Sequence, residues 1–203
     1  MASTKRKSTR SKKEALDGSE LLVLELQEIH SAENQLSRVL PRLAKAAESE
    51  TLRQKLEERL AEGERVLQEV DSALEELDES PGRKKNVAAE GLINDAREHV
   101  QEIQPGPALD AVLIGAIQKT EHYCIAAWGT AKALGQALGH TSVVRAMERA
   151  LKEGKAFDEE LTQLAEKEVT PLLLSQSEEE EEESEGTTRG RSSRGSGSER
   201  RTN

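Results

Sequence analysis

Apolar residues recur along most of this chain at alternating steps of three and four, the spacing that places them on one face of an α-helix. Ser19 and Ser49 are candidate N-caps, and Gly- or Pro-containing breaks fall at 80–82, 105–107 and 138–142. The pattern therefore predicts five helices, over residues 19–47, 50–78, 86–103, 107–138 and 141–168.

The order of long and short helices predicts the architecture. Two hairpins of long helices with tight turns are separated by the shorter helix over 86–103, whose sequence is NVAAEGLINDAREHVQEI. Four long helices with one longer connection form a four-helix bundle. The fold class is predicted as all-α, with the short helix in the crossover.

Carboxylates interrupt the apolar rows of these helices. Glu33 stands where an apolar residue is expected between Ile29 and Leu36, and Glu121 interrupts the row of the fourth helix in the same way. In the second helix Glu62 lies beside a gap in the apolar row. The residues that we assign to this row are Leu56, Leu60, Leu67, Val70, Leu74 and Leu77. In the last helix the intruding acid is Asp158.

The heights of these acids suggest that they meet. At about 1.5 Å of rise per residue, Glu33 and Glu62 lie about 23 and 20 Å from the turn that joins their helices. Glu121 and Asp158 both lie about 28 Å from the second turn, and Glu153 about 20 Å. Buried like charges cost several kcal/mol unless they are protonated or bridged by cations. A carboxylate-lined metal site in the bundle core would resolve this conflict.

The alternative is that each acid lies at the edge of its row and reaches water. The stability of the metal-free protein distinguishes the two interpretations. If Glu33 and Glu121 hold metal, their replacement by Leu should raise the melting temperature of the metal-free protein, because burial and mutual repulsion would be relieved.

Composition adds two tails and excludes several classes of protein. Residues 1–18 are basic and 171–203 are first acidic and then rich in Arg, Ser and Gly, so both are predicted to be disordered around a helical domain over 19–170. The net charge of −10 opposes nucleic-acid binding except for weak contact through the basic tails at low salt. The sequence shows no secretory signal and no apolar stretch long enough to span a membrane, and Cys124 is its single cysteine. We therefore expect a cytoplasmic protein that binds no membrane.

Four segments carry a resemblance to a known family. ELQEIHSAENQLSRVLPRLAKAA, AAEGLINDA, IQKTEHYCIAAWGTAKALGQALGH and LKEGKAFDEELTQLAE occur in that order and spacing over about residues 19–168. They resemble the YciE/YciF family of ferritin-like stress proteins. The resemblance implies a ferritin-like bundle that is usually dimeric, with a dinuclear iron centre and a ferroxidase-type activity; manganese is an alternative metal.

The acidic pattern of that family matches this chain at Glu33, Glu62, Glu121, Glu153 and Asp158. The chain departs from it at Val66, where a polar residue is usual, and at Cys124 and Gly154, where Glu is expected. His30 precedes Glu33 by three residues on the same helical face and could supply a nitrogen ligand, although a structural role is the simpler interpretation. His122 faces a strip of small residues and is assigned to a helix contact.

Two main hypotheses follow. In the first, Glu33 and Glu121 are the central ligands, with Glu62 and either Glu153 or Asp158 terminal, in an oxidoreductase that passes electrons from Fe(II) to dioxygen or peroxide. In the second, the protein is a non-catalytic helical homodimer in which the metal site of the family has decayed.

Overall fold

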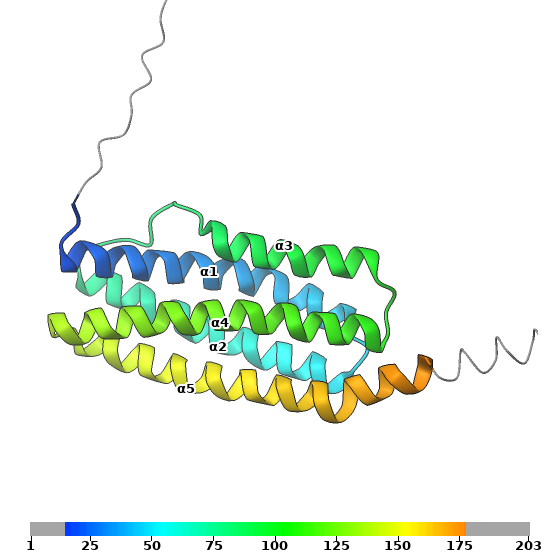
Figure 1. Cartoon of the computed structure of the whole chain (residues 1–203). Coiled ribbons are helices and arrows are strands. Elements are labelled where there is room, and N and C mark those ends of the chain that lie inside the picture. Colours follow the sequence, from blue (N-terminus) through cyan, green and yellow to red (C-terminus); the bar gives the residue numbers. More distant parts are fainter. Residues whose placement is uncertain (1–14, 178–203) are drawn as a thin grey trace, which may run out of the picture.

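The computed structural model describes residues 15–177, and this part of the chain contains helices and no strand. The helices are α1 (Gly18–Ala46), α2 (Glu50–Glu76), α3 (Val87–Glu102), α4 (Pro107–Leu138) and α5 (Thr141–Leu164), and α5 continues into a π-helical turn, η1 (Ala165–Val169) (Figure 1). The predicted all-α class is confirmed, and each predicted helix is found within a few residues of its expected bounds.

Local chemistry explains where the helices begin and end. Ser49 caps α2 as predicted, by accepting a hydrogen bond from the backbone N–H of Leu52. The predicted cap at Ser19 is wrong, because Asp17 caps α1 and forms a reciprocal capping box with Glu20. Gly139 ends α4 with a φ of 81°, a left-handed conformation that glycine adopts without a steric penalty.

The four long helices form a square bundle. α1 packs against α2 and α4, and α5 packs against the same two helices from the opposite corner. The shorter α3 runs along the outside of α1 and α4, so it covers the crossover side of the bundle (Figure 1). This arrangement confirms a four-helix bundle with an extra helix in the crossover.

The buried face of α2 differs from the predicted row. Its buried positions follow steps of three and four through Leu52, Leu56, Arg59, Gly63, Val66, Val70, Ala73 and Leu74. Leu60 and Leu67, which were assigned to the row, are only partly buried. Two overlapping apolar stripes exist on this helix, and packing against α1 and α5 selects the stripe that contains Arg59.

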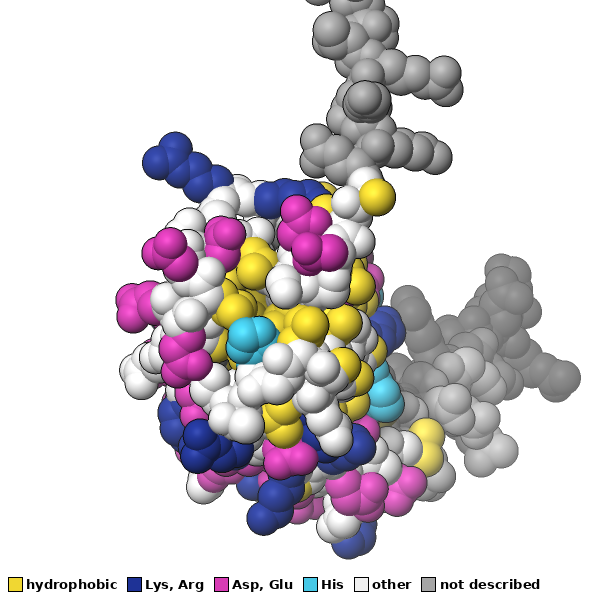
Figure 2. Space-filling view, turned by 90° about the vertical axis from the view of Figure 1, so that its left-hand side faces the viewer, with side chains coloured by type: hydrophobic (Ala, Val, Ile, Leu, Met, Phe, Trp, Pro, Cys, Tyr) yellow, Lys and Arg dark blue, Asp and Glu magenta, His cyan; other side chains and the backbone are white. Residues whose placement is uncertain are grey.

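The end of the bundle formed by the start of α1 and the end of α4 carries an apolar patch. Leu16, Leu21 and Leu138 are all substantially exposed there, at 51%, 36% and 38%. Figure 2 shows hydrophobic side chains gathered on this end face among charged ones. No helix of residues 15–177 is long and apolar enough to cross a membrane.

The last helical segment of the described chain is longer than the predicted helix over 141–168. The helical conformation continues through residues 170–177, where the sequence analysis places the start of the tail. The other predicted tail residues, 1–14 and 178–203, lie outside the described part of the chain, so their disorder stays a prediction.

Candidate functional site: a buried ion triad

Three charged side chains meet in the core of the bundle. Glu33, Arg59 and Glu121 are 1%, 1% and 0% exposed, and we call them the ion triad. Arg59 donates from Nη2 to Glu33 Oε1 at 3.0 Å, from Nη1 to Glu33 Oε2 at 3.1 Å, and from Nε to Glu121 Oε2 at 2.7 Å. Paired charges with this many hydrogen bonds are the form in which ions are tolerated inside a protein.

Each member of the ion triad comes from a different helix, namely α1, α2 and α4. On each helix the charged residue stands between apolar neighbours that belong to different core clusters. One cluster includes Leu36, Leu56 and Ile117, and the other includes Ile29, Val66 and Cys124. The ion triad is therefore a polar layer that divides the hydrophobic core in two.

Two buried glycines make room for this layer. A Cβ at Gly63 would lie 3.0 Å from both Arg59 Nη1 and Glu33 Oε2. A Cβ at Gly154 would lie 2.5 Å from Glu121 Oε1 and from Trp128 Cζ3, a separation that real Cβ atoms do not show. The helix backbones of α2 and α5 thus approach the ion triad as closely as they do because both positions lack a side chain.

An apolar wall closes the layer. Trp128 is 2% exposed, and its ring centroid lies 5.7 Å from Arg59 Cζ, within the range of a cation–π interaction. The void bordered by Glu33, Cys124 and Trp128 leaves no room for a water molecule. Water therefore does not screen the charges from this side, and electrostatic effects between them are strong.

The pKa values of the ion triad reflect this burial. Burial acts to lower the pKa of Arg59, but the attraction of Glu33 and Glu121 outweighs it, so this pKa is raised well above its ordinary value. The pKa of Glu121 is raised to about 7, mainly by burial, with repulsion from Glu33 adding to the effect and Arg59 opposing it. Glu121 Oε1 accepts no hydrogen bond from the described residues. This carboxyl is therefore partly protonated near neutral pH.

Burial also sets the pKa and the reactivity of the Cys124 thiol. Its thiol is fully enclosed, and burial raises its pKa well above the ordinary value, with Glu33 and Glu121 adding to the effect. A thiol with a raised pKa is a weak nucleophile and a weak metal ligand, because the thiolate is the reactive form.

The other predicted metal ligands do not join the ion triad. Glu62 and Glu153, from α2 and α5, are only partly buried, and Glu153 pairs with Arg65 at 3.2 Å. The pKa of Glu62 is raised, mainly by burial; Arg59 opposes this increase and Glu153 adds to it, so the two glutamates are electrostatic neighbours of the layer. They lie beside the core rather than within it.

Asp158 and His30 have partners elsewhere. Asp158 accepts a hydrogen bond from Gln118 Nε2 at 3.2 Å and lies 3.3 Å from His122 Nε2, on the surface between α4 and α5. His30 Nε2 lies 3.3 Å from Asp71 Oδ1, which links α1 to α2. The predicted structural role of His30 agrees with this contact.

The donor set does not fit the dinuclear metal centre that the resemblance implies. Within residues 15–177 no group of three or more His, Cys, Asp and Glu side chains is arranged to hold a metal ion. The two carboxylates that do converge, Glu33 and Glu121, share a guanidinium group instead. Val66 and Cys124 are buried as apolar members of the core, and Gly154 contributes no side chain.

Arg59 is the functional residue that the sequence analysis missed. Its signal was the stripe through Leu56, Arg59, Gly63 and Val66, in which a charged residue interrupts an apolar row just as Glu33 and Glu121 do. An Arg in such a slot usually places its head group in water. The two acids on neighbouring helices are the reason that it stays inside.

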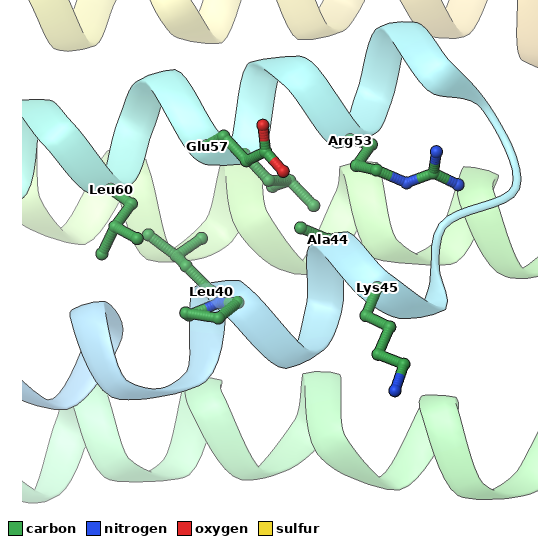
Figure 3. Close-up of a pocket in the computed structure, with 8 residues that line it drawn as sticks. Leu40, Ala44, Lys45, Arg53, Glu57 and Leu60 are labelled. Carbon is green, nitrogen blue, oxygen red and sulfur yellow. The ribbon is translucent and has the colours of Figure 1, made fainter.

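A groove of about 460 Å³ lies elsewhere, between α1 and α2 near their shared turn. Figure 3 shows its apolar residues, including Leu40, Ala44 and Leu60, and the charged Lys45, Arg53 and Glu57 around them. None of the predicted site residues lines it. The groove therefore adds nothing to the ion triad.

Comparisons with known proteins agree with the fold. The protein YciF of Escherichia coli strain K12 is 39% identical over 141 residues, which are 69% of this chain and 85% of YciF. The crystal structure of that stress protein superimposes with a TM-score of 0.71 at 36% identity, covering 74% of this chain and 96% of YciF. The protein YcfI of Rhodopseudomonas palustris gives a TM-score of 0.69 at 32% identity, covering 76% of this chain and 96% of YcfI.

The family assignment rests on a match along the whole helical domain. The family model described as "Domain of unknown function (DUF892)" matches residues 17–173, which include all five helices and the ion triad. The chain therefore belongs to the DUF892 family and is a YciF-like protein with a ferritin-like helical bundle.

Proposed function

We propose that this protein is a non-catalytic, stress-associated helical protein that works as a homodimer, with an internal arginine in place of a metal centre. One observation carries the proposal: the guanidinium group of Arg59 lies between Glu33 and Glu121 and makes hydrogen bonds to both. The description of YciF as a stress protein supports the physiological setting.

The geometry argues against chemistry at these carboxylates. Three of the four carboxylate oxygens of Glu33 and Glu121 accept hydrogen bonds from Arg59. The fourth, Glu121 Oε1, faces the backbone at Gly154. A metal ion that activates dioxygen or peroxide needs several ligands and an open coordination position. The guanidinium group takes the place where such an ion would be held.

The competing function is ferroxidase-type oxidation of iron, or binding of manganese, by the acids of the sequence analysis. It would require Glu62 and either Glu153 or Asp158 to leave their present surroundings and converge on the ion triad. It would also require Arg59 to withdraw from a layer in which its charge is needed. For these reasons we favour the non-catalytic function.

The outer face of α4 supports the homodimer. Gly115, Ala126 and Gly129 lie on this face, and a Cβ at either glycine would have no heavy atom within 4 Å. His122, on the same face, is 67% exposed. Small residues let the backbones of two helices approach closely, so a second copy of the chain could pack here.

Two measurements test the proposal on the full-length protein. Anaerobic titration with Fe(II) should show no tight equivalent per chain, and exposure to dioxygen should produce no ferric absorbance above that of buffer. Tight binding of one or more Fe(II) per chain, with oxidation, would establish the ferroxidase function instead.

Light scattering after size exclusion tests the dimer. The native chain should have the mass of two copies, and Gly129→Arg should have the mass of one, because a long charged side chain blocks close approach. Glu64→Arg, on an exposed part of α2, serves as the matched control and should remain a dimer. A native monomer would refute this part of the proposal.

A further inference from the structure

We infer that a small pocket between α1 and α3 binds a phosphate group, either the free ion or the phosphate of a small ester. α3 runs along the outside of α1, and the pocket between them has a volume of about 120 Å³ (Figure 1). Three basic side chains line it, namely Arg38 of α1, Arg97 of α3 and Lys85 just before α3. None of them belongs to the ion triad or to the outer face of α4, so this site is independent of the proposed function.

The two arginines of the pocket have no acidic partner. Within residues 15–177 neither Arg38 nor Arg97 takes part in an ion pair or a side-chain hydrogen bond, whereas other arginines pair with a glutamate, among them Arg53, Arg65 and Arg149. Acidic partners are abundant, because the chain has 39 Asp and Glu against 29 Lys and Arg. Arg97 is nonetheless partly buried. A charge that is partly withdrawn from water favours a counter-ion, and an anion in the pocket would supply it.

The charges around the pocket favour a dianion. Lys85 forms an ion pair with Glu90, the one acidic side chain among the lining residues. Asp95, the next acid on α3, forms its ion pairs elsewhere. Arg38 and Arg97 are therefore left uncompensated, and the lining carries a net charge of +2, since three positive side chains oppose one negative. A phosphate monoester carries a charge of about −1.5 to −2 at neutral pH, which matches this excess.

The donors and the size of the pocket suit a single phosphate group. A guanidinium group binds phosphate oxygens through two parallel N–H donors, and the exposed amide of Asn94 adds donors at the same pocket. The volume of about 120 Å³ is well below the roughly 300–1,000 Å³ of pockets that enclose a whole small molecule, so the rest of an ester would stay in solvent. Nucleic acid is disfavoured, because the net charge of −10 repels a phosphate backbone.

Titration of the isotope-labelled, full-length protein with inorganic phosphate, followed by nuclear magnetic resonance at constant ionic strength and neutral pH, tests the site. Amide signals around Arg38 and Arg97 should shift to saturation. Arg38→Gln and Arg97→Gln should each weaken binding about tenfold or more, because each removes a charge-assisted hydrogen bond. Arg42→Gln is the matched control, one turn further along α1, exposed and outside the pocket, and it should bind as the native protein does. Glu90→Gln should tighten binding about threefold, because it removes a negative charge from the pocket.

A second titration, with glycerol phosphate, identifies the source of the group. Tighter binding of the ester would indicate a phosphorylated small molecule, and tighter binding of inorganic phosphate would indicate the free ion; both support the site. If Arg97→Gln loses its helical circular dichroism, Arg38→Gln, at an exposed position, decides alone.

Four results would overturn the inference. They are the absence of saturable shifts, equal shifts with chloride at the same ionic strength, equal affinities of Arg38→Gln and Arg42→Gln, and binding of duplex DNA through these arginines without binding of inorganic phosphate.

Discussion

The stability of this protein should fall with rising pH because of one buried carboxyl, and Glu121→Gln should remove that dependence. The pKa of Glu121 is raised from 4.5 to about 7 in the folded protein, mainly by burial. The folded state therefore holds this proton more tightly than the unfolded chain does. The resulting stabilisation is complete below pH 4.5, is lost progressively as the pH rises to about 7, and changes no further above it.

The size of the effect follows from the shift. One pKa unit corresponds to about 1.4 kcal/mol, so the free energy of unfolding should fall by about 3 kcal/mol through this carboxyl between pH 4.5 and 7. Glutamine has nearly the same shape and carries no titratable proton. The difference in free energy of unfolding, native minus Glu121→Gln, should therefore decrease by that amount across the window.

Urea unfolding, followed by far-UV circular dichroism at several pH values, measures this difference. Urea is uncharged and does not screen the ion triad as guanidinium chloride would. Glu64→Gln, on an exposed part of α2, is the control, and its difference from the native protein should stay nearly constant. A difference for Glu121→Gln that is also constant across the window would refute the reasoning, because the buried carboxyl would then titrate as in the unfolded chain.

Two further predictions concern the packing of the same layer. The double variant Glu33→Leu/Glu121→Leu should lose about 3–5 kcal/mol of unfolding free energy in urea, because Arg59 would remain buried without partners; the sequence alone suggested a gain in stability. Adding Arg59→Leu to this variant should recover most of the loss. A double variant that is more stable than the native protein would show that Arg59 reaches water. Gly154→Ala should lose about 1–3 kcal/mol of stability in thermal unfolding, because its Cβ would lie 2.5 Å from packed atoms. The control is Gly91→Ala in α3, whose Cβ would have nothing within 4 Å and which should gain up to about 1 kcal/mol. Equal changes in stability for the two variants would contradict the close approach of α5.

The helices could be read from the sequence because their signals are local. The three-and-four spacing of apolar residues, the cap at Ser49 and the glycine at 139 each act within a few residues of the chain. The same spacing identified Glu33 and Glu121 as acids in apolar rows, and both are buried. The segments shared with YciF-like proteins lie in these same helices, so fold and family followed from the sequence as well.

The tertiary structure alone decided what lies between those two acids. The sequence predicted a conflict of buried charges and offered a metal ion as its resolution, yet α2 carries two overlapping apolar stripes, and the sequence does not say which one faces the core. Packing against α1 and α5 selects the stripe with Arg59, and this choice turns a conflict between two acids into an ion triad. It was not predictable because the rotation of α2 is set by contacts with helices distant in sequence, whereas propensity and periodicity describe each helix by itself.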